Sequence, residues 1–108
     1  MDIAAQASYG LTINVGDDAT FLILKTGTGS DSVTFGDHAT FNEIDTGEGS
    51  DSISLSDDVS GNKIKAGSGD DTVDTGNREE ITTVDGAEGN DSYTTQTSGT
   101  NSSNMETT

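Results

Sequence analysis

The sequence predicts an all-β protein, a parallel β-solenoid or β-roll of about four 20-residue coils, which we expect to be right-handed. The first observation is a repeat, because the pattern of TGTGSDSVTF at residues 26–35 recurs as TGEGSDSISL at 46–55, as AGSGDDTVDT at 66–75 and, weakened, as GAEGNDSYTT at 86–95. The second is that nearly every large apolar residue recurs at the same 20-residue period. The third is the absence of proline, which suits unbroken backbone ladders.

The composition limits how such a fold is stabilised and what it binds. Only 28% of the 108 residues are hydrophobic, and 20 acidic residues face 4 basic ones, for a net charge of −16. So little apolar surface favours disorder unless something besides core packing stabilises the chain. The charge argues against nucleic acid and anionic membranes as partners and favours cations. No segment approaches the length of a membrane-spanning helix or has the pattern of a standard N-terminal signal, and cysteine is absent.

Writing the chain in rows of twenty residues sorts the apolar side chains into columns. Between the columns lie polar residues, so each row contains short segments of alternating polarity, such as Ile13-Asn14-Val15, which predict strands. Stacked rows would bury a continuous but thin core. The columns are Ile13, Val33, Ile53, Val73 and Tyr93; Val15, Phe35 and Leu55; Leu24, Ile44, Ile64 and Val84; Ala19, Ala39 and Val59; and Phe21, Phe41, Gly61 and Ile81.

The charged residues support the same register. Lys25, Asp45, Lys65 and Asp85 alternate in sign down one column, which avoids repulsion between stacked like charges. Two further columns hold carboxylates without a basic neighbour, so they need solvent or a counter-ion. These are Asp31, Asp51, Asp71 and Asp91, and Asp17, Asp37 and Asp57 with Asn77.

The first of these carboxylate columns ends a Gly-x-Gly-x-Asp corner in each row. Alternating glycines permit positive φ, so a tight turn can aim its carbonyls inward at a shared point. Ca²⁺ takes six to eight oxygen ligands, from carboxylates and backbone carbonyls, with tolerant geometry, whereas Mg²⁺ is stricter. We therefore predict calcium ligands in these corners. The candidate residues are Gly27, Gly29, Asp31, Gly47, Gly49, Asp51, Gly67, Gly69, Asp71, Gly89 and Asp91.

These corners resemble the nonapeptide calcium-binding repeats of the RTX family, Gly-Gly-x-Gly-x-Asp-x-U-x, where U is apolar. Residues 26–34, 46–54, 66–74 and 86–94 follow this pattern, with Val33, Ile53, Val73 and Tyr93 at U. The resemblance implies Ca²⁺ held between successive corners by the aspartates and by carbonyls of the glycine turns. It also implies a secreted or cell-surface location.

The repeat departs from the family in two respects. The first glycine is replaced in three copies by Thr26, Thr46 and Ala66, and the second glycine becomes Ala87 in the fourth. The nonapeptide also occurs once per coil, whereas RTX rolls carry it on both sides, so we expect a single row of ions. This one-sided layout is similar to the calcium β-solenoids of large RTX adhesins.

Other residues are expected to be structural. The opposite corner, for example Gly36-Asp37-His38-Ala39, predicts a polar turn in which His38 is solvated. Asn42 and Asn62 occupy matching positions and are expected to stack inside the coil. The acidic residues follow the repeat and form no singular catalytic pair, so enzyme activity is not expected.

The boundaries predicted from the repeat are an N-terminal cap at 1–12, the calcium-binding solenoid at 13–95 and a disordered tail at 96–108. The predicted function is a calcium-dependent structural or adhesin-type module whose folding is coupled to Ca²⁺. One alternative is a metal-independent solenoid of a filament or fibre, and a weakly capped end suggests end-to-end self-association. Another is an ice- or carbohydrate-binding module, for which Ser32, Ser52, Thr72 and Ser92 form the closest exposed ladder.

Overall fold

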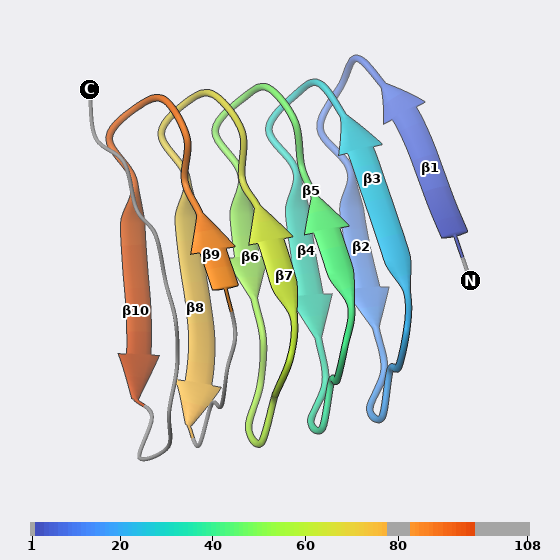
Figure 1. The fold of residues 1–108 in the computed structure, drawn as a ribbon. Helices are drawn as coiled ribbons and strands as arrows, with labels where there is room; N and C mark the ends of the chain where they lie inside the picture. The colour runs from blue at the N-terminus through green and yellow to red at the C-terminus, as the bar shows by residue number, and fades with distance from the viewer. Residues whose placement is uncertain (1, 78–82, 97–108) are drawn as a thin grey trace.

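The computed structural model describes residues 2–77 and 83–96, and all regular secondary structure in this part is β-strand (Figure 1). It contains no helix long and apolar enough to cross a membrane. The strands are β1 (Asp2–Ala7), β2 (Thr12–Val15), β3 (Ile23–Gly27), β4 (Ser32–Phe35), β5 (Glu43–Asp45), β6 (Ser52–Ser54), β7 (Lys63–Lys65), β8 (Thr72–Asn77), β9 (Thr83–Asp85) and β10 (Ser92–Gln96).

The strands form two parallel sheets that face each other. The odd sheet has the order β1-β3-β5-β7-β9, and the even sheet has the order β10-β8-β6-β4-β2. The chain therefore passes from one sheet to the other at every turn, and strands of the two sheets run in opposite directions (Figure 1). The predicted parallel β-solenoid is confirmed.

The strand register reproduces the 20-residue period of the sequence. In the even sheet Val33 pairs with Ile53 and Ile53 with Val73. In the odd sheet Leu24 pairs with Ile44, and the oppositely charged Lys25 lies beside Asp45. The terminal strands are less regular, because the pairing of β1 with β3 and of β10 with β8 each contains a register shift. The two outermost strand pairs thus depart from the repeat.

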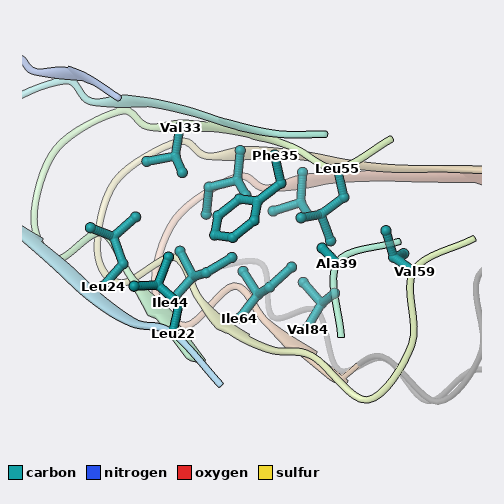
Figure 2. Packing of buried hydrophobic residues seen from close by; sticks show 12 residues of the cluster. Leu22, Leu24, Val33, Phe35, Ala39, Ile44, Leu55, Val59, Ile64 and Val84 are labelled. Carbon is teal, nitrogen blue, oxygen red and sulfur yellow. The ribbon is translucent and has the colours of Figure 1, made fainter. Parts of the chain in front are cut away.

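The apolar core lies between the two sheets (Figure 2). Alternate residues of the strands β2 to β7 point inward. Three of the predicted columns therefore supply most of the core, and Phe35 is its largest fully buried side chain. Ile13, Val15 and Ala19 are only partly buried, because β2 is the edge strand of the even sheet and has a neighbouring strand on one side only. The buried cluster consists of Leu22, Leu24, Val33, Phe35, Ala39, Ile44, Ile53, Leu55, Val59, Ile64, Val73 and Val84, with Ile13, Val15 and Ala19 packed against it.

One predicted core column is wrong. Phe21 and Phe41 are 67% and 58% exposed, and their rings stack on the outside of the coil. Their backbone φ values are 56° and 54°, in the left-handed region, which breaks the period-2 alternation of an extended segment. Leu22, the next residue, takes the inward position and is buried. Ile81, in the same column, lies outside the described residues.

The predicted N-terminal cap at 1–12 and the predicted disordered tail at 96–108 both remain predictions. β1 pairs with β3 as the first strand of the odd sheet, within the segment expected to be a cap at 1–12. Gln96 is the last residue of β10, and the rest of the predicted tail, 97–108, lies outside the described residues.

Candidate metal centre

The corner that follows each odd strand is built on glycines with positive φ. Gly47 and Gly49 have φ values of 80° and 128°, a region that residues with a Cβ seldom adopt. A Cβ at either position would also collide with a carbonyl oxygen of the preceding coil, that of Gly27 or of Gly29. These carbonyls therefore lie between successive coils, against the next glycine. The same positive φ recurs at Gly27, Gly29, Gly67, Gly69 and Gly89.

The aspartates that end these corners point into the solenoid. Asp31, Asp51 and Asp71 are only 2%, 2% and 1% exposed, although they are carboxylates in a thin domain. We name Asp31, Asp51, Asp71 and Asp91 the aspartate ladder. The sequence correctly placed them in one column, but it gave no sign that three of them are buried.

Each ladder carboxylate accepts a hydrogen bond from the backbone of the preceding coil. The N–H groups of Leu11, Asp31 and Asp51 donate to Oδ1 of the aspartate twenty residues later, at 2.9, 2.7 and 2.9 Å. The N–H of Asp71 donates in the same way to Asp91, at 3.0 Å. One oxygen of each side chain thus forms a hydrogen bond that joins successive coils.

The second carboxylate oxygen has no such partner in most of the ladder. Oδ2 of Asp51, Asp71 and Asp91 is buried and accepts no hydrogen bond. Asp31 differs, because the Thr26 hydroxyl donates to its Oδ2 at 2.6 Å. Buried polar groups are normally hydrogen-bonded, and a buried charge requires a partner. Each of these three oxygens therefore requires a proton or a bound cation as its partner.

The residue five positions before each aspartate accounts for the missing hydroxyl partner of Asp71 and Asp91. This column reads Thr26, Thr46, Ala66 and Gly86. Thr46 donates its hydroxyl to the Ala66 carbonyl at 3.0 Å, and Ala66 and Gly86 have no hydroxyl. These positions are the first glycine of the nonapeptide pattern, where the sequence showed a departure but not its consequence for the carboxylates.

Burial changes the acidity of the ladder. Desolvation raises the pKa of Asp71 from 3.8 to about 6, against the lowering effect of the Asp51 N–H, and the carboxylates of Asp51, Asp91 and Asp70 raise it further. Desolvation also raises the pKa of Asp51, while the hydrogen bond from the Asp31 N–H opposes the shift. The cost of the negative charge is therefore concentrated in the middle of the stack.

A second, neutral ladder lies at the other end of the odd strands. Asn42 and Asn62 are buried in matching positions as predicted, but their amides bond to the main chain and not to each other. Oδ1 of each accepts the N–H of the residue twenty positions earlier, at 2.8 and 2.9 Å. Their Nδ2 groups donate to the carbonyls of Ala19 and Ala39, at 3.0 and 2.9 Å. We name this pair the asparagine ladder.

The corner after each even strand carries further carboxylates near the surface. Oδ1 of Asp17 and of Asp37 accepts the N–H of the aspartate in the next coil, at 2.9 and 3.1 Å. His38 is exposed, as expected for a turn residue, and its two ring nitrogens lie 3.1 Å from Asp18 and 3.7 Å from Asp58. These carboxylates are solvated, so this corner lacks the buried oxygens without partners that distinguish the aspartate ladder.

A hollow on the outer side of the glycine corners brings solvent close to them. Its lining includes Gly27 and Gly47 together with the carboxylate-bearing residues Asp45 and Glu48. In the described part of the chain, however, no three acidic, histidine or cysteine side chains come together as a metal cage. An ion at this corner would therefore need carbonyl oxygens and water in addition to carboxylates.

The chain has no recognised relatives in the comparisons. No protein-family model, no curated protein and no solved structure matches it. The fold and the repeat define its class, a parallel β-solenoid with a buried row of carboxylates.

Proposed function

We propose that the protein is a calcium-binding, RTX-like β-solenoid module of a secreted or surface protein, with a structural or adhesin-type role and Ca²⁺-coupled folding. The observation that carries this proposal is the row of buried carboxylate oxygens without partners, Oδ2 of Asp51, Asp71 and Asp91. They lie in a chain with a net charge of −16. A hard divalent cation matches both the atom type and the charge.

The residues available to hold the ion are the ladder aspartates and the glycine carbonyls between coils. The buried oxygens fit such a role because they lack donors, and Gly27, Gly29 and their equivalents bring main-chain oxygens to the same corner. The bound cation would supply the positive charge that offsets the crowded carboxylates. The chain itself contributes the 20-residue register, which stacks each aspartate against the next coil.

A calcium titration of chelator-treated protein tests this proposal. Because an ion that binds only the folded state stabilises it by mass action, one site adds about 2.7 kcal/mol at a free concentration 100 times Kd. Circular dichroism and thermal melting should therefore show a gain of β-structure or of stability as Ca²⁺ is added. An equal melting curve in calcium and in chelator would refute it.

Asp71→Asn is the matched variant, because asparagine keeps an oxygen that can accept the Asp51 N–H and removes the charge. We expect it to be more stable than the parent protein in chelator, by on the order of 1 kcal/mol, and to gain less stability from calcium. An unaltered response to calcium in this variant would remove Asp71 from the site.

A metal-independent structural solenoid is the second candidate. It is favoured by the hydrogen bond that each ladder carboxylate already accepts, and by the absence of a three-residue metal cage in the described part. In that case a proton on Asp71 replaces the cation, and chelator has no effect.

End-to-end assembly would join the outermost strands, and the register shifts in β1 and β10 disfavour regular pairing there.

An ice- or carbohydrate-binding module has less support. The even sheet brings Ser32, Ser52, Thr72 and Ser92 into register. Asp74 lies on the same strand as Thr72, two residues further on, and adds a charge to this ladder of hydroxyls. Thermal hysteresis or a glycan array would detect such an activity directly.

A further inference from the structure

Two exposed aromatic rings lie at the corner opposite the candidate metal centre. Phe21 and Phe41 expose 67% and 58% of their surface, and their ring centroids are 5.5 Å apart with an interplanar angle of 11°. Such a stacked pair is favourable, but most of its apolar area still faces water. The core is completed without it, because Leu22 takes the inward position.

The backbone at these rings is unfavourable for a large side chain. Phe21 and Phe41 adopt φ values of 56° and 54°, and the equivalent residue of the next coil is Gly61, with φ of 68°. Glycine takes this conformation freely, whereas a bulky residue is strained in it. The fold alone would therefore favour glycine at positions 21 and 41. The exposed aromatics are explained better by an interaction than by packing.

The turns at this corner also carry carboxylates. Asp18 lies in the same turn as Phe21, with 79% of its side chain exposed, and Asp58 lies two coils along the same column at 36%. His38 lies between these two carboxylates. The net charge of −16 adds a long-range field of the same sign. A second copy of this chain would be repelled by that field, whereas a basic partner would be attracted.

We propose that the Phe21–Phe41 pair and the neighbouring carboxylates of Asp18 and Asp58 form a docking surface for an arginine-bearing segment of another protein. A guanidinium group stacks on aromatic rings and pairs with carboxylates, so one side chain type satisfies both features. The surface lies outside the glycine corners and uses none of the candidate calcium ligands. It therefore stands independently of calcium binding.

The test is the binding of a labelled peptide of alternating glycine and arginine, followed by fluorescence anisotropy in buffer with excess calcium. The double variant Phe21→Gly/Phe41→Gly removes both rings and matches the residue found at position 61. We expect it to raise Kd about fivefold or more, since each cation–π contact at an exposed site contributes a factor of about two to five. Its circular dichroism melt should stay close to that of the parent protein.

The control variant is Tyr9→Ser, which removes another exposed aromatic ring, 69% exposed, away from the pair. It should leave Kd unchanged, and a peptide of alternating glycine and lysine should bind the parent protein more weakly than the arginine peptide. If the double variant loses its β signal, Phe21→Leu keeps the apolar bulk, removes one ring, and should still weaken binding.

Three results would overturn the docking surface. One is an unchanged Kd in the ring variants, and another is an equal loss of affinity in Tyr9→Ser. The third is that the rings bind something else. This would appear as binding of a neutral oligosaccharide, or as dimerisation in sedimentation, that is lost in the ring variants. The calcium titration has a separate readout, so failure of either proposal leaves the other one to be judged by itself.

Discussion

The aspartate ladder and the asparagine ladder meet the same structural need in different ways. Both place a side-chain oxygen where it accepts the backbone N–H of the residue twenty positions earlier, at 2.7–3.0 Å. Such bonds satisfy donors that would otherwise be buried without a partner where the chain turns between sheets. Stacking of the coils therefore requires an acceptor at these positions, but it does not require a charge.

The second atom of each side chain makes the difference. The Asn62 amide donates to the Ala39 carbonyl at 2.9 Å, so every polar atom of that group has a partner. The corresponding oxygen of Asp71 is buried and has none. A neutral ladder is complete as it stands, whereas the acidic ladder becomes complete only with a proton or a cation. This contrast is the physical basis of the calcium proposal.

The two corners also differ in the space around the backbone, and this leads to the largest expected effect. Gly69 has φ of 121°, and an added Cβ would collide with the Gly49 carbonyl, whereas the asparagine corner admits Phe21 and Phe41. Gly69→Ala should therefore lower the free energy of unfolding by about 3 kcal/mol, from strain and overpacking together. Chemical denaturation in saturating calcium measures the change.

Gly16→Ala is the control for this substitution, because an added Cβ there meets no atom within 4 Å. It should change the stability by less than about 1 kcal/mol. Equal effects of the two alanines would mean that the coils are not stacked as closely at the glycine corner as the structure indicates.

A smaller effect is expected from moving the charge into the neutral ladder. Asn62→Asp keeps an acceptor for the Asn42 N–H but removes the donor to Ala39, and it buries a carboxylate next to a carbonyl oxygen. The cost at neutral pH should be about 2 kcal/mol, and acid should restore part of it by protonating the new carboxyl. Thermal melts at several pH values measure this.

Asn14→Asp adds the same charge at an exposed position of β2 and should change the stability little. If both variants lose equal stability, the net charge of the protein is responsible and the local difference between the ladders is not.

The sequence was sufficient to predict the solenoid and its register. A fixed period places Leu24 beside Ile44 and Asp51 beside Asp71 whatever the details of each turn, because stacked coils bring equivalent residues together. The same period also identified the glycine corners. Glycine is the residue that most readily adopts a positive φ, so its regular spacing indicates where the backbone turns in this way.

The period could not indicate which way each side chain points at a turn. Phe21 and Phe41 were placed in the core because they recur, but their left-handed backbone turns them outward, and φ is not encoded by recurrence. The burial of the ladder aspartates and the hydroxyl bond from Thr26 to Asp31 were also unpredicted. They depend on local geometry within one corner, and a different residue in one copy, such as Ala66, is enough to change them.

The smallest expected effect is a dependence of stability on pH that calcium removes. Burial raises the pKa of Asp71 from 3.8 to about 6, so between these values the folded state holds the proton more tightly than the unfolded state. In chelator, stability should therefore be highest below about pH 4 and should fall as the pH rises through 6, by on the order of 1 kcal/mol after solvent screening. Calcium requires the carboxylate, and both the calcium-bound folded state and the unfolded state have lost this proton above about pH 5, so in saturating calcium the stability should change little over this range. Thermal melts between pH 4 and pH 8 with and without calcium, with Asp71→Asn as the variant that flattens the slope in chelator, measure it. Parallel slopes in the two conditions would mean that proton and cation do not compete for this oxygen, and the acidic ladder would then differ from the neutral one in charge alone.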